Sequence, residues 1–206
     1  MRPEPIYVKA GDTFFTHSNT LLGKLIRWGE TDLGETNGTW ANHMGVVVED
    51  GWIGDTDPQA VPAIIIEALW KTRKGPLTLA GNLGVRVFRP IPPYSPEELT
   101  RFRSKAEEFV GRTYGWWKIL FQLADRVLFK GRKVLTTALF LDKRPICSYL
   151  AARVNAAAES LERQIARVQL TQDPRAFGIP AQSVDPDEAL DYCLANPRLW
   201  EEIRVE

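Results

Sequence analysis

Residues 42–48 read Asn42-His43-Met44-Gly45-Val46-Val47-Val48, so a polar pair stands directly before an apolar run. The run is followed by Glu49-Asp50-Gly51, a turn signal, and a buried strand is therefore predicted over residues 44–48. Similar apolar runs at residues 63–69 and 85–88 predict two further strands, and a short strand is expected at residues 12–15. The first half of the chain is thus predicted to be mainly β.

The second half carries helical signals. Residues 95–98 form a capping box with proline at the first helical position, and Gly111 is the expected stop of that helix. A second helix is predicted to begin after Pro145, with Ile146, Leu150, Val154, Ala157 and Leu161 on one face. Residues 185–188 repeat the cap pattern and predict a last helix that ends near residue 196.

Other segments carry weaker signals. Residues 21–28 have helical spacing, residues 29–42 favour a loop, and residues 115–141 are long and rich in aromatic and apolar residues. The last of these is expected to be a helical insertion or lid. The predicted fold is α+β, a single domain over residues 1–206 with a small antiparallel sheet of about five strands and helices packed on it.

Composition is that of an ordinary soluble protein. Of 206 residues, 44% are apolar and 25% charged, and the net charge is zero, which argues against a nucleic-acid partner. Residues 1–5 do not resemble the start of a secretory signal, and no apolar run reaches the length of a membrane span. We therefore expect a cytoplasmic protein without stable membrane insertion, while release or partner-assisted export stays open.

Cysteine and histidine are scarce, which limits the possible chemistry. The chain has two of each, Cys147 and Cys193 with His17 and His43, and none of their spacings is typical of a structural zinc site. No disulfide, metal or organic cofactor is expected. Cys147 falls in the first turn of its predicted helix, where backbone N–H groups and the helix dipole lower the pKa of a thiol. The alternative is that Cys147 is a small buried apolar side chain.

Two polar residues at strands complete a candidate set. His43 directly precedes its strand, where a base would be held rigidly, and His17 is a competitor for the same role. Glu67 interrupts an apolar run, and a buried carboxylate there needs a partner such as a histidine on a neighbouring strand. Such a pair would fix the tautomer of the histidine. The alternatives are a surface histidine and an acid turned to solvent at a sheet edge.

The order of these segments resembles a known family. Residues 11–15, 42–48, 65–68 and 146–150 follow one another as in the circularly permuted branch of the NlpC/P60 superfamily, which includes YiiX-like proteins and, more distantly, lecithin:retinol acyltransferases. Residues 111–114 and 183–186 are also similar to that branch. In the standard branch the cysteine helix comes first, whereas here it follows the strands. Asn42 departs from the family, which often has serine before the histidine.

The resemblance implies a papain-like fold and a set of roles. Cys147 would be the nucleophile, His43 the base and Glu67 the acid that orients it. Tyr114, Asn42 and Ser148 are the expected substrate-binding residues.

Three functions follow from this set. The first is a cysteine hydrolase that cleaves an amide bond, for example in a cell-wall peptide or another small peptide-like substrate. The second is a lipid-directed acyltransferase or esterase with the same Cys–His pair, and the third is a non-catalytic binding or structural module. The partner is thus expected to be a small peptide-like or acyl substrate, and the oligomeric state is undetermined.

Overall fold

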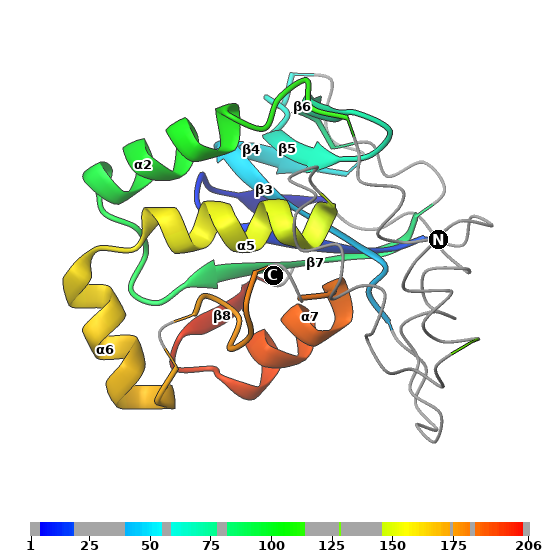
Figure 1. Cartoon of the computed structure of the whole chain (residues 1–206). Coiled ribbons are helices and arrows are strands. Elements are labelled where there is room, and N and C mark those ends of the chain that lie inside the picture. The colour runs from blue at the N-terminus through cyan, green and yellow to red at the C-terminus, as the bar shows by residue number, and fades with distance from the viewer. Residues whose placement is uncertain are drawn as a thin grey trace.

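A six-stranded antiparallel sheet forms the centre of the molecule in the computed structural model (Figure 1). Its strand order is β6-β5-β3-β2-β7-β8, and a separate antiparallel pair is formed by β1 and β4. The structure describes residues 5–18, 40–54, 59–77, 82–113, 128, 146–173, 175–181 and 184–203. The strands are β1 (Ile6–Val8), β2 (Thr13–Ser18), β3 (His43–Glu49), β4 (Gly51–Ile53), β5 (Ile64–Ala68), β6 (Thr72–Pro76), β7 (Asn82–Pro90) and β8 (Trp200–Ile203).

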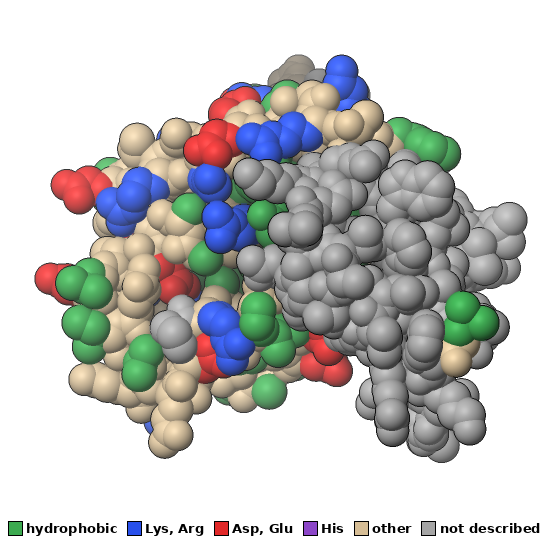
Figure 2. Space-filling view, in the orientation of Figure 1, with side chains coloured by type: hydrophobic (Ala, Val, Ile, Leu, Met, Phe, Trp, Pro, Cys, Tyr) green, Lys and Arg blue, Asp and Glu red, His purple; other side chains and the backbone are tan. Residues whose placement is uncertain are grey.

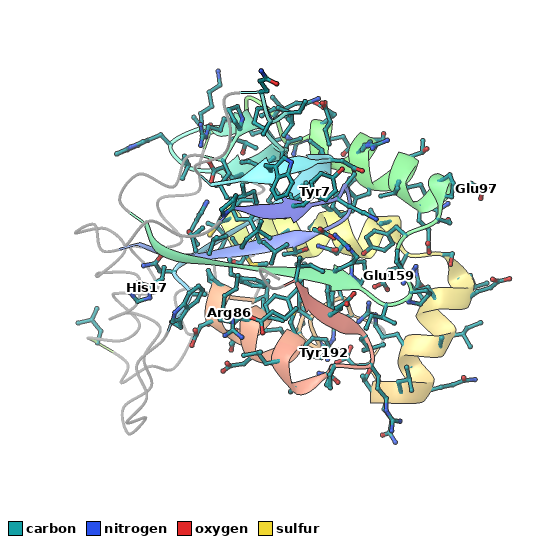
Figure 3. The ribbon with its side chains drawn as sticks, turned by 180° about the vertical axis from the view of Figure 1, so that it is seen from behind. Tyr7, His17, Arg86, Glu97, Glu159 and Tyr192 are labelled. Carbon is teal, nitrogen blue, oxygen red and sulfur yellow. The ribbon has the colours of Figure 1, made fainter. Side chains whose placement is uncertain are left out.

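Strand alternation divides the core into two clusters, one on each face of the sheet. Met44, Val46 and Val48 of β3 belong to the larger cluster with the helices, whereas Val47 belongs to a smaller cluster that β1 and β4 cover. Tyr7 of β1 marks the second face in Figure 3, where the molecule is seen from behind. The sheet is therefore buried on both faces, which explains why β3 reads as a continuous apolar run.

The described helices lie on one face of the sheet (Figure 1). They are α2 (Pro96–Glu107), α5 (Cys147–Ala158), α6 (Leu161–Thr171) and α7 (Pro186–Ala195). The capping boxes predicted for α2 and α7 are both present, at Ser95 and Asp185. In α5, Asn155 fixes the helix to the sheet, since its amide donates to the Thr13 hydroxyl and its carbonyl accepts from Tyr94.

The structure differs from the sequence prediction at several boundaries. The helix that begins at Cys147 ends at Ala158, and Leu161 opens a new helix with 72% of its surface exposed. Ser160 causes the break because its hydroxyl caps α6. Helix α2 ends at Glu107, and Gly111 lies in a following turn with φ of +82°. The main sheet has six strands where about five were expected.

Some predictions fall on residues that the structure does not describe. These are the helix at residues 21–28, nearly all of the loop at residues 29–42, Tyr114, and the insertion at residues 115–141 except Leu128. Within the described part of the chain, no helix is both long and apolar enough to cross a membrane.

Candidate active site

Cys147 is the first residue of α5, and its position follows from the local sequence. Ile146 is the N-cap residue, so its carbonyl accepts the first intrahelical bond, from the Leu150 N–H. Its apolar side chain makes no capping hydrogen bond. The side chains of Ser95, Ser160 and Asp185 cap the other described helices. The cysteine is therefore placed where the helix dipole favours negative charge, and it is 4% exposed.

His43 and Glu67 form a hydrogen-bonded pair across neighbouring strands. The His43 Nε2 lies 2.7 Å from Glu67 Oε2, and the side chains are 16% and 3% exposed. In the register of β3 and β5, Glu67 stands opposite Gly45, two residues beyond His43, so the longer side chains meet along the strand. The expected histidine partner of Glu67 is thus present, and the solvent-facing alternative for Glu67 is wrong.

Cys147 completes the set through a hydrogen bond to the imidazole. Burial by itself lowers the pKa of His43, but hydrogen bonds to Cys147 and Glu67 and the charge of both groups outweigh it and raise the pKa to about 10. Because Glu67 occupies Nε2, Nδ1 is the ring nitrogen left for the thiol. The three residues that the sequence singled out for chemistry therefore meet in one place.

Glu67 has a second cation that the sequence reasoning missed. Arg73 of β6 donates from Nε to Glu67 Oε1 at 2.7 Å, and its Nη2 forms an ion pair with the same oxygen. Burial raises the pKa of Glu67, but His43 and Arg73 together lower it below its ordinary value. Arg73 is the direct cross-strand partner of Glu67 in the register of β5 and β6. The sequence signal that could have identified Arg73 is a basic residue that follows a buried acid, Glu67, at the distance of a short hairpin.

Backbone bonds hold the segment that leads into His43. The carboxylate of Asp187, in the first turn of α7, accepts from the N–H groups of Trp40 and Ala41 at 2.9 and 3.1 Å. The ring of His17 meets the Trp40 carbonyl with its Nδ1 at 2.6 Å. In Figure 3, His17 lies at the end of the sheet away from Glu159, which follows the C-terminal end of α5. His17 therefore bonds to a backbone carbonyl, whereas His43 bonds to the carboxylate of Glu67.

The expected substrate-binding residues are placed as follows. Ser148 is buried, and its hydroxyl donates to the Val184 carbonyl at 2.6 Å, which ties the start of α5 to the segment before α7. Asn42 is buried and its N–H donates to the Thr16 carbonyl. Tyr114 lies outside the described residues. Their contact with substrate stays a prediction.

The packing around Gly45 explains why a glycine stands two residues after His43. A Cβ at Gly45 would lie 2.5 Å from the Phe14 ring and 2.9 Å from the Ile66 carbonyl oxygen, which is closer than packed atoms approach. The same Phe14 ring contacts the His43 imidazole edge to face, with centroids 6.3 Å apart. Glycine at this position thus lets an aromatic ring support the imidazole.

Two hollows in the described surface lie away from these residues. One of about 870 Å³ runs between Pro92, Arg163, Leu170 and Leu199, at the C-terminal end of α5. A second of about 340 Å³ lies between Lys74 and Arg103. Exposed apolar side chains of α6 gather near the first (Figure 2). Neither hollow is lined by Cys147 or His43.

Comparison with known proteins shows the fold. No protein-family model matches the sequence, and no curated protein matches it significantly. The crystal structure of YiiX from Escherichia coli O157:H7, described as a metalloprotein with the domain DUF1105, is similar at a TM-score of 0.53 and 16% identity. The match covers 96% of this chain and 97% of that one. The chain therefore has a YiiX-like fold, in agreement with the resemblance seen in the motifs.

Proposed function

We propose that the chain is a cysteine hydrolase of the circularly permuted, papain-like kind and that it cleaves an amide bond in a peptide-like substrate. The observation that carries the proposal is the position of His43, which is hydrogen-bonded both to Glu67, through Nε2, and to Cys147. A binding module needs a fold but has no need for a thiol, a base and a buried acid in series. The raised pKa of His43 favours an imidazolium beside a thiolate at neutral pH.

Acylation uses each of the three residues once. The Cys147 thiolate attacks the carbonyl carbon, and the electron pair of the C=O bond moves to the oxygen. Backbone N–H groups in the first turn of α5 stabilise that oxyanion. As the C–N bond breaks, the His43 imidazolium gives its proton to the leaving nitrogen, and a thioester on Cys147 remains.

Deacylation returns the site to its first state. Neutral His43 takes a proton from water, whose oxygen attacks the thioester carbonyl, and the C–S bond breaks to release a carboxylic acid and the thiolate. Glu67 stabilises the imidazolium that forms and holds Nε2, so that Nδ1 faces the reacting atoms. An alcohol or amine in place of water would give acyl transfer by the same steps.

The described residues do not favour a metal at this position. The neighbour is described as a metalloprotein, but no group of three or more His, Cys, Asp or Glu in the described part of this chain is arranged to hold an ion. His43 Nε2 and Glu67 Oε2 face each other, and Arg73 takes Oε1. Of these groups, only the Nδ1 of His43 and the Cys147 thiol are left for an incoming ion, and we assign no step to a metal.

Iodoacetamide labelling of the native protein at pH 6, followed by mass spectrometry of each cysteine, tests the proposal. Cys147 is expected to react, whereas Cys193 is an internal control because burial raises its pKa well above the ordinary value. His43→Ala should slow the labelling of Cys147 about 10-fold or more, since the thiolate loses its counter-ion. Cys147 no more reactive than Cys193 would leave only the non-catalytic module.

A panel of substrates distinguishes the proposed amide hydrolase from the alternative, a lipid-directed acyltransferase or esterase. Peptide amides and long-chain acyl esters are each offered to the protein, and the thioacyl adduct on Cys147 is measured by mass spectrometry. An adduct from the amides and none from the esters is expected. The reverse result would establish the lipid-directed alternative. Cys147→Ala must abolish turnover of either substrate, because no other group supplies the nucleophile in this mechanism.

A further inference from the structure

Glu67 lies between two basic side chains, of which one can lose its charge and the other cannot. Its Oε2 faces the His43 ring and its Oε1 faces the Arg73 guanidinium. The imidazolium loses its charge when it gives up its proton, whereas arginine stays charged at any working pH. A third titratable group, Cys147 of α5, is hydrogen-bonded to the same ring. Cys147 of α5 and Glu67 of β5 thus act on His43 directly, and Arg73 of β6 acts on Glu67.

The two states of His43 place different demands on Glu67. While His43 is charged, the buried carboxylate has two counter-ions. Once His43 has delivered its proton, a 3% exposed carboxylate would be left without compensation, which is costly in a protein interior. Arg73 removes that cost because it stays paired with Oε1 in both states.

We propose that Arg73 is a positioning residue, which keeps Glu67 ionised and bonded to His43 while His43 gives up and regains its proton. This rests on the proposed function, since only a reacting histidine changes charge in turn. Arg73 shares the charge of Glu67, so the imidazolium is held less tightly and its proton is available to the leaving group. Without Arg73, Glu67 would attract that proton more strongly.

The geometry argues for charge rather than for support of the strand. Glu67 comes from β5, an interior strand with partners on both sides, so its backbone is fixed without Arg73. Arg73 comes from the edge strand β6 and is 39% exposed. The next residue, Lys74, pairs with Glu107 and Glu49 instead, and its register partner is Ile66. Two adjacent basic residues on one strand thus serve different partners.

The test is a titration of His43 by nitrogen-15 NMR of the imidazole rings, which is tractable because the chain has two histidines and a His17→Gln variant assigns them. Arg73→Gln is expected to shift the pKa of His43 upwards, since Glu67 then acts on the ring alone. Glu67→Gln should shift it downwards. Arg73→Lys should keep the wild-type value, and Lys74→Gln is the matched control that should not move it.

Each outcome decides between the claims. A pKa of His43 that falls or stays constant in Arg73→Gln, and in Arg73→Met as a second neutral variant, overturns the role of Arg73. A wild-type His43 that titrates near its ordinary value overturns the proposed function, and this role with it. An upward shift in both neutral variants with rescue by lysine supports the proposal, because loss of a merely structural contact would release Glu67 and lower the pKa.

Discussion

At the scale of single residues, Gly45 leaves no room for a larger side chain beside the site. Gly45→Ala should lower the free energy of unfolding by about 1–3 kcal/mol, because its Cβ would overlap the Phe14 ring. The displaced ring would also move against His43, so labelling of Cys147 should slow. Urea denaturation and iodoacetamide rates measure both effects.

Gly75 supplies the matched control for this prediction. It lies on β6, and a Cβ there meets no atom within 4 Å. Gly75→Ala should leave labelling unchanged and stability the same or slightly higher, since alanine restricts the unfolded chain. Equal stability of the two variants would contradict the packing argument for Gly45.

At the scale of elements, α7 fixes both halves of the candidate site. Asp187 accepts two backbone N–H groups before His43, and Val184, just before the helix, accepts from Ser148 beside Cys147. Asp187→Ala should cost about 1–3 kcal/mol, because two N–H groups lose this acceptor. His43 would be held less firmly, so Cys147 labelling at pH 6 should slow. Urea denaturation and labelling rates again measure the change.

Asp191→Ala is the control for the two hydrogen bonds that Asp187 accepts. It removes the same side chain from an exposed position of the same helix, where substitutions usually change stability by less than about 0.5 kcal/mol. If Cys147 labelling slows to the same extent in both variants, the effect comes from the charge of the helix. The role of the Asp187 hydrogen bonds is then refuted.

The sequence was sufficient for elements that carry their own local pattern. Capping boxes located α2 and α7, and apolar runs located β3 and β5, so His43 and Glu67 could be placed at strands. Strand β6 was missed because Thr72–Pro76 contains a glycine and a proline and has no apolar alternation. It is a strand because β5 offers it an edge, and Arg73 was missed with it. Long-range pairing of this kind has no local signature.

At the scale of the whole molecule, Glu98 joins elements distant in sequence. It accepts hydrogen bonds from the N–H groups of Ser95 and Ser160 and from the Arg163 guanidinium. Burial raises the pKa of Glu98, but these bonds outweigh it and hold the pKa well below the ordinary value. A carboxylate of this kind stabilises the fold above its unfolded pKa, and the contribution is lost as the pH falls.

Glu98→Gln should therefore lose about 2 kcal/mol at pH 7 and depend less on pH than the wild type between pH 7 and 3. Urea denaturation at both values measures the difference. Glu97→Gln, at the exposed neighbouring position, should retain the wild-type dependence (Figure 3). Identical acid sensitivity of wild type and Glu98→Gln would show that other carboxylates dominate.

The order of the site residues along the chain bears on how the protein is made. His43 and Glu67 are synthesised well before Cys147, and β8, the last described strand, closes the edge beside β7. From the synthesis of Glu67 until Cys147 is added, a nascent chain thus carries the base and the acid without the nucleophile. The thiol joins them only when α5 docks on a sheet whose strands β2 to β7 have already left the ribosome. On the proposed mechanism, an incomplete translation product that stops before Cys147 has no nucleophile and cannot form the thioester.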